Sequence, residues 1–204
     1  GEDAFVLGSN APMWPSIGTV HGMRITNDIK YNWRCIRELA EQGFPRNWQN
    51  QSLWINDPDN LILRNHEQIF VGFSRTDTNV SENEFSFHAA YVLASGGMIL
   101  AGDRMMALEE PHKQILRKLS PPSGNAAVFD DRDFTVGRIE TADGWLLCLF
   151  NWGDTEIRSC AVLDAACDLY DYWTDTKLAE NATRIPFLSL PAHSARVVAC
   201  VRVG

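Results

Sequence analysis

The chain has 204 residues, of which 45% are hydrophobic and 22% are charged, and its formal net charge is −8. This composition is ordinary for a soluble globular protein and excludes a disordered, collagen-like or disulfide-dense chain. The acidic excess argues against binding to nucleic acid, which depends on clustered Lys and Arg. No window approaches the roughly 20 apolar residues of a membrane helix, so we expect no membrane partner.

The five cysteines show neither a Cys-x-x-Cys spacing nor a neighbouring group of histidines. This pattern predicts no zinc site, and we expect buried free thiols. An odd number of cysteines favours a reducing compartment such as the cytoplasm.

Short apolar strands and helix-like segments alternate over the first part of the chain. Strands are predicted at residues 5–7, 22–25, 53–55 and 98–101. Apolar residues at helical spacing predict a helix over 29–40 that stops at Gly43. Ser81 and Glu84 form a capping box that opens a second helix, which Gly96 ends, and a third helix covers 111–119. Such alternation is typical of parallel βα units.

Two prolines, a glycine and two serines at residues 120–124 predict a domain boundary, with one domain at 1–122 and another at 123–204. The second part holds short apolar runs separated by turns. Strands are predicted at residues 133–139, 145–152, 157–162, 167–173, 184–190 and 195–203. This pattern predicts a small antiparallel β-sandwich.

Polar residues follow each predicted strand of the first part, where ligands bind in parallel βα folds. They are Ser9 and Asn10 after the first strand, Asp28 after the second, Asp57 and Asp59 after the third, and Asp103 after the fourth. Alone, Asp28 could cap the following helix, and Asp57-Pro58-Asp59 could form an Asx turn. Together these residues predict a carboxylate-rich pocket, as sugar hydrolysis or metal binding requires.

Three segments carry a resemblance to a known family: Gly-Ser-Asn-Ala-Pro at 8–12, His-Gly-Met-Arg-Ile-Thr-Asn-Asp from residue 21 with Trp33, and Trp-Ile-Asn-Asp-Pro-Asp-Asn-Leu from residue 54 with Arg64. In order and rough spacing they resemble the motifs of melibiase-type α-galactosidases, glycoside hydrolase families 36 and 27. Residues 94–100 look like the last barrel strand of that family, and residues 171–174 and 193–196 resemble its C-terminal β-domain. The resemblance implies an α/β plus all-β chain: about the last four βα units of a (β/α)8 TIM barrel, then an antiparallel β-sandwich.

The resemblance also implies roles in a retaining glycosidase, with no metal and no organic cofactor. Asp28 matches the general acid/base, and Arg24 matches an arginine that contacts the sugar and the nucleophile. Ser9, Asn10 and Trp14 fall in the loop around the C2 substituent of the sugar. The loop that holds Asp57 and Asp59 borders the pocket and supports it.

Two departures from the family pattern keep alternatives open. Ser9 stands where the family often has Cys, and Asn10 where it has Gly or Glu. These positions help to choose a 2-hydroxyl or a 2-acetamido group, so an α-N-acetylgalactosaminidase competes with an α-galactosidase. Related families also include transglycosidases, which keeps that reaction open.

The second departure is that the family's nucleophile motif lies upstream of every segment matched here. About 120 residues precede the domain boundary predicted at residues 120–124, whereas a whole barrel takes about 250. We therefore expect a fragment that carries the acid/base without the nucleophile, inactive alone. Its open sheet edges would pair with the N-terminal half of the barrel or with a second copy. A non-catalytic carbohydrate-binding or assembly fragment is the alternative.

Overall fold

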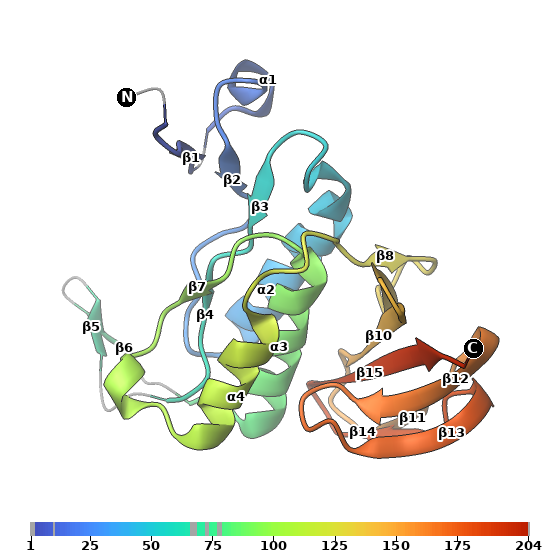
Figure 1. The fold of residues 1–204 in the computed structure, drawn as a ribbon. Coiled ribbons are helices and arrows are strands. Elements are labelled where there is room, and N and C mark those ends of the chain that lie inside the picture. Colours follow the sequence, from blue (N-terminus) through green and yellow to red (C-terminus); the bar gives the residue numbers. More distant parts are fainter. Residues whose placement is uncertain (1–2, 10, 66–68, 72–73, 77–78, 204) are drawn as a thin grey trace.

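The computed structural model describes residues 3–9, 11–65, 69–71, 74–76 and 79–203. Strands β1 (Leu7–Gly8), β2 (Gly22–Arg24) and β3 (Ile55–Asp57) form a parallel sheet in the order β1-β2-β3. Strand β4 (Asn60–Leu61) directly follows β3 and pairs in parallel with β7 (Leu100–Ala101), as Figure 1 shows. The four strands predicted in this part are therefore confirmed, with bounds that differ by up to two residues.

Three helices alternate with these strands along the chain: α2 (Trp33–Gly43) after β2, α3 (Glu82–Ser95) before β7, and α4 (Glu110–Leu119) after β7. Helix α3 begins at the predicted capping box, and Gly96 ends it in a left-handed conformation at φ 65°. The prediction for α2 was wrong at its start. Asn32 is its N-cap and accepts a hydrogen bond from the Cys35 amide at 3.0 Å, so Asp28 lies four residues outside the cap.

Several short elements were not predicted from the sequence. They include strand β4, α1 (Met13–Ser16), the 3₁₀ helices η1 (Phe44–Gln49) and η2 (Met105–Ala107), and the hairpin of β5 (Ile69–Val71) with β6 (Ser74–Thr76). In the described ranges no helix is long and apolar enough to cross a membrane.

The C-terminal part is a six-stranded antiparallel sheet in the order β13-β12-β15-β10-β9-β8. Its strands are β8 (Val128–Phe129), β9 (Val136–Thr141), β10 (Gly144–Asn151), β12 (Val162–Asp171), β13 (Lys177–Arg184) and β15 (Ser194–Arg202). Strands β11 (Ile157–Ser159) and β14 (Leu188–Leu190) form a separate two-stranded sheet. The predicted strands at 157–162 and 184–190 are each interrupted, and β13 was not predicted except for its last residue, Arg184.

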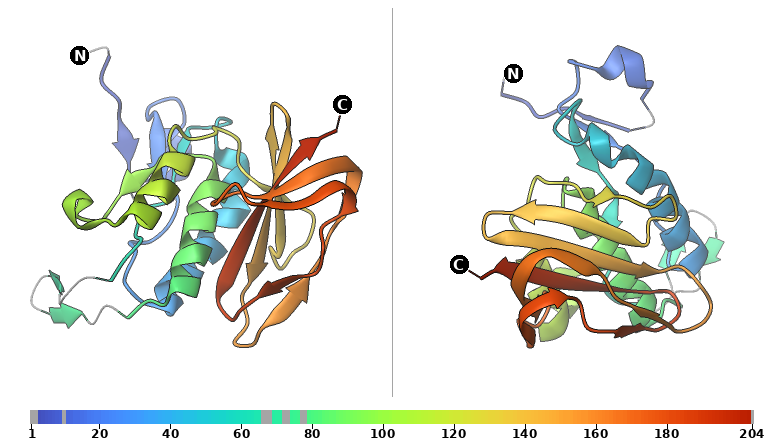
Figure 2. Two further views of the ribbon diagram at one scale, coloured as in Figure 1. Left: turned by 60° about the horizontal axis from the view of Figure 1, so that its bottom comes forward. Right: turned by 90° about the vertical axis from the view of Figure 1, so that its right-hand side faces the viewer.

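Helix α3 lies between the parallel strands and the antiparallel sheet (Figures 1 and 2) and contacts β15 and β10. Every residue of β10 is buried because both faces of this strand are covered. Cys148 and Phe150 face the core that α3 shares, whereas Trp145 and Leu149 join a second core beside β14. This alternation follows from the two-residue period of a strand.

All five cysteines are free thiols. The expectation of burial holds for Cys148, Cys167 and Cys200, whereas Cys35 is partly exposed and Cys160 is exposed. Burial raises the pKa of the Cys148 and Cys200 thiols to about 12.

Candidate functional site

Arg24 ends strand β2 and lies beside Asp57 at the end of β3, because the parallel register pairs these two residues. Paired residues of neighbouring strands point to the same face of a sheet. The Arg24 Nε atom accordingly lies 2.9 Å from Asp57 Oδ2. The Asp57 side chain is fully buried and that of Arg24 is 15% exposed, so strand pairing alone creates a largely buried ion pair.

The turn after β3 brings a second carboxylate to the same guanidinium. Asp57 Oδ1 accepts a hydrogen bond from the Asp59 amide at 2.9 Å, which confirms the Asx turn, and Asp59 has a left-handed φ of 75°. Asp59 Oδ1 thereby lies 3.0 Å from Arg24 Nη1. The other Asp59 oxygen accepts a hydrogen bond from the Ile29 amide. Asp59 therefore connects the end of β3 to the segment that follows β2.

Asp28 completes the group from the solvent side. Its Oδ1 atom lies 3.2 Å from Arg24 Nη1, and its side chain is 89% exposed. One guanidinium thus contacts three carboxylates, of which two are buried and one is exposed to solvent. We call Arg24, Asp28, Asp57 and Asp59 the arginine–carboxylate group. Its formal charge is −2, and the arginine lies at its centre.

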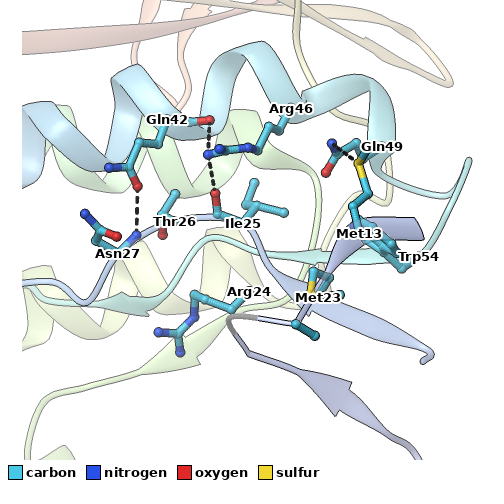
Figure 3. A pocket seen from close by; sticks show the side chains of 11 residues that line it. Met13, Met23, Arg24, Ile25, Thr26, Asn27, Gln42, Arg46, Gln49 and Trp54 are labelled. Carbon is cyan, nitrogen blue, oxygen red and sulfur yellow. Dashed lines mark hydrogen bonds between the residues drawn. The ribbon is translucent and has the colours of Figure 1, made fainter. Parts of the chain in front are cut away.

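Helix α2 and the 3₁₀ helix η1 that follows it fix the backbone between Arg24 and Asp28 (Figure 3). Gln42 Oε1 accepts a hydrogen bond from the Asn27 amide, and Glu38 Oε1 accepts one from Asn27 Nδ2, both at 2.8 Å. Arg46 Nη1 donates to the Ile25 carbonyl at 2.7 Å. The segment that carries Asp28 is therefore held by side chains that lie one turn apart on a helix.

Two neighbouring cavities border Arg24. The first, of about 300 Å³, is lined by Ser9, Arg24, Thr26, Asn27, Asp28, Lys30, Cys35 and Glu38. The second, of about 280 Å³, is drawn in Figure 3 and lies between β2, α1 and the end of α2, with Met13, Met23 and Trp54 on its apolar side. The first volume is at the lower limit of the range for small-molecule sites, about 300–1,000 Å³, and the second is just below it.

The structure places the residues predicted from the sequence as follows. Ser9, Arg24 and Asp28 line one cavity, and Asp57 and Asp59 lie behind Arg24. Trp14 is in α1, is 76% exposed and lines neither cavity, so its contact with a sugar stays a prediction. Asn10 lies outside the described residues.

The sequence motifs did not point to Lys30, Glu38 or Gln42 as part of this region. Glu38 and Gln42 are four residues apart on α2 and therefore share a helix face. That spacing was visible in the sequence, but nothing in it indicated that this face meets Asn27. Asp103 is also buried, and its Oδ2 atom accepts a hydrogen bond from the Leu63 amide at 2.7 Å.

Two buried side chains of α3 contact backbone carbonyls of the segment 58–60, which follows β3. Tyr91 donates its hydroxyl to the Pro58 carbonyl at 3.3 Å, and a His88 ring nitrogen lies 3.1 Å from the Asn60 carbonyl. Burial lowers the pKa of His88 to about 4 and raises that of Tyr91. Both groups are therefore neutral near pH 7, as hydrogen-bonding supports for the turn require. Across the described ranges no group of three His, Cys, Asp or Glu side chains is arranged to hold a metal ion.

No protein-family model matches this chain. Several solved structures do resemble it in fold. A variant of the family 27 β-L-arabinopyranosidase of Geobacillus stearothermophilus, in complex with arabinose, superposes with a TM-score of 0.75 at 16% identity over 91% of this chain. The α-galactosidase I of Mortierella vinacea gives 0.73 at 15% identity over 95%. The isomalto-dextranase of Arthrobacter globiformis, complexed with panose, gives 0.68 at 16% identity over 100%.

The chain has a fold like that of family 27 glycoside hydrolases. It spans about half the length of the enzymes it matches: 46% of the arabinopyranosidase, 56% of the α-galactosidase and 39% of the isomalto-dextranase. These three enzymes are named for different sugars, so the fold alone does not assign one to this chain.

Proposed function

We propose that this chain is part of a retaining glycoside hydrolase of the α-galactosidase type and supplies its general acid/base, Asp28. The observation that carries the proposal is the arginine–carboxylate group, in which one guanidinium at the end of β2 contacts Asp28, Asp57 and Asp59. The group stands at the carboxyl ends of parallel strands, where enzymes with barrel folds place their catalytic residues. The fold likeness to glycoside hydrolases supports the same reading.

In this proposal the exposed and the buried carboxylates have different roles. Asp28 is open to solvent and can give a proton to the glycosidic oxygen and later take one from water. Asp57 and Asp59 are buried against Arg24 and serve to orient its guanidinium. Arg24 then presents its positive charge to the sugar and to a carboxylate nucleophile, which a charge of that sign helps to keep ionised.

The parallel strands β1, β2, β3, β4 and β7 would form part of a (β/α)8 barrel within residues 1–122, and residues 123–204 the β-domain behind it. Within the described part of the chain, β1 pairs only with β2, and β7 only with β4. Phe5, Val6 and Leu7 along the β1 edge are 52%, 45% and 39% exposed. Open edges of this kind favour a partner. The first candidate is the half of the barrel that carries the nucleophile, and the second is another copy of this chain.

The substrate we propose is a terminal α-galactoside. The support is the resemblance of residues 21–33 and 54–64 to melibiase-type motifs, including those of family 36. Ser9, which lines the cavity with Asp28, and Asn10 differ from the usual residues of that loop. An α-N-acetylgalactosaminide is therefore the second candidate substrate, and transfer to another sugar is a second candidate reaction.

The test uses the full-length protein and p-nitrophenyl α-galactoside. Asp28→Ala should lower turnover by about a hundredfold or more, the usual contribution of general acid–base catalysis. Undiminished turnover in that variant would refute the role of Asp28. The p-nitrophenyl N-acetylgalactosaminide, assayed beside it, decides between the two sugars. Hydrolysis by residues 1–204 alone would show that this chain contains its own nucleophile.

A further inference from the structure

A further cavity lies away from the arginine–carboxylate group. It has a volume of about 690 Å³ and lies between η1, the segment 124–130 and strand β9. Its lining shares no residue with either of the two cavities that border Arg24.

Side-chain amides hold the walls of this cavity in place. Asn47 Nδ2 donates to the Ala127 carbonyl at 2.9 Å and to the Ala94 carbonyl at 3.1 Å. Asn50 Nδ2 donates to the Gly124 carbonyl at 2.7 Å, and Asn125 Nδ2 donates to the Glu140 carbonyl at 3.0 Å. These bonds tie η1, the segment 124–127 and β9 together. The cavity is thus formed before any ligand arrives, which lowers the entropic cost of binding.

The lining combines an aromatic floor with an exposed aromatic wall. The Phe44 ring packs 4.6 Å from that of Phe129, and Phe129 packs 5.3 Å from Phe134. Beside this floor Trp48 lines the cavity and is 60% exposed. A large apolar ring left in water at the rim of a preformed cavity offers a flat stacking surface.

The charged groups at the rim carry a formal net charge of −1 and offer both donors and acceptors. Arg138 donates from Nε to Glu140 Oε1 at 2.6 Å and also pairs with Asp164, so its charge is compensated twice. Asp130 and Glu140 add two exposed carboxylates to the lining. This arrangement disfavours an anionic ligand, because the single cation is already paired.

We propose that this cavity, which we call the Trp48 cavity, is a second carbohydrate site that binds one pyranose unit. The CH face of a pyranose stacks on an indole ring, and its neighbouring hydroxyls suit the adjacent donors and acceptors of Arg138, Glu140 and Gln51. The volume fits a small neutral ligand of this size. The site goes beyond the proposed hydrolase and does not depend on the role of Asp28.

The test is a titration of the 204-residue chain, labelled with ¹⁵N at tryptophan, with methyl α-galactoside, methyl α-glucoside and raffinose at millimolar concentrations. The indole N–H signal of Trp48 is assigned by its loss in Trp48→Phe. We expect this signal to shift saturably with at least one of the three sugars. Isothermal titration calorimetry, which does not need the Trp48 signal, then compares the affinities of the variants. Trp48→Ala should weaken the binding about fivefold or more, and Trp48→Phe should retain most of it.

Phe187→Ala is the matched control, because Phe187 is 66% exposed and lines none of the cavities described above. It should bind as the unchanged chain does. The proposal is overturned if no sugar shifts the Trp48 signal, if Trp48→Ala binds as tightly as the unchanged chain, or if Phe187→Ala weakens binding equally. Far-ultraviolet circular dichroism of each variant confirms that its fold is intact.

Discussion

The two kinds of carboxylate around Arg24 should differ sharply in what they contribute to stability. Asp57 is fully buried and makes two bonds, one to Arg24 Nε and one to the Asp59 amide, both at 2.9 Å. Removing one partner of a buried ion pair costs about 3–5 kcal/mol. Arg24 keeps Asp59 at 3.0 Å, so we take the lower end for Asp57→Ala, about 3 kcal/mol.

Asp28→Ala is the internal comparison because it removes a carboxylate from the same guanidinium. Asp28 is 89% exposed, and exposed ion pairs contribute about 0–1 kcal/mol. We therefore expect this variant to unfold within about 1 kcal/mol of the unchanged chain. Asp57→Asn should lie between the two alanine variants, because its amide oxygen can still accept the bond from the Asp59 amide.

The assay is urea unfolding followed by circular dichroism. With a slope of about 2 kcal/mol per molar urea, a loss of about 3 kcal/mol lowers the midpoint by about 1.5 M. Asp28→Ala should shift the midpoint by less than about 0.5 M. Equal shifts for Asp57→Ala and Asp28→Ala would refute the reasoning, because they would mean that burial does not distinguish the two carboxylates.

Two further predictions concern the support beneath the strand ends. Burial lowers the folded-state pKa of His88 to about 4 from an ordinary 6.5, so the unfolded chain binds a proton that the folded chain does not. The free energy of unfolding should accordingly fall by up to about 3 kcal/mol between pH 6.5 and pH 4. His88→Gln should remove that part of the pH dependence, and an unchanged profile in the variant would contradict this. A Cβ atom at Gly97 would lie 2.0 Å from the Asn56 carbonyl oxygen, so Gly97→Ala should lower the melting temperature strongly. Gly18→Ala is the control, because a Cβ atom there meets nothing within 4 Å. It should lower the melting temperature less, through the strain of its φ of 76° alone.

The sequence predicted those parts of the fold whose signals are local. The parallel strands are short apolar runs, and α3 begins at a capping box and ends at a glycine, so each bound is set by neighbouring residues. The start of α2 is different. Asn32 caps that helix, and the Ile29 amide instead donates a hydrogen bond to Asp59. The residues near Ile29 in the sequence give no sign of this contact with a distant segment. Strand β13 was missed except at Arg184 because its residues are mostly exposed and lack a clear apolar alternation.

The candidate site was likewise predictable only in part. Motif spacing singled out Arg24, Asp28, Asp57 and Asp59, and the structure brings these four together. The division into two buried carboxylates and one exposed carboxylate comes from the β2–β3 register and the Asx turn, which a spacing pattern does not contain. The support from α2 and the Trp48 cavity depend on contacts between distant segments and were missed for the same reason.

The central claim is that Asp28 is the general acid/base, and the most direct measurement is chemical rescue of Asp28→Ala in the full-length enzyme with sodium azide. Azide that enters at the vacated acid/base position attacks the glycosyl-enzyme intermediate from the face of the departing group. The account predicts restored turnover of p-nitrophenyl α-galactoside and an α-galactosyl azide product. A β-galactosyl azide would instead identify Asp28 as the nucleophile, and the absence of rescue together with wild-type turnover would contradict any catalytic role.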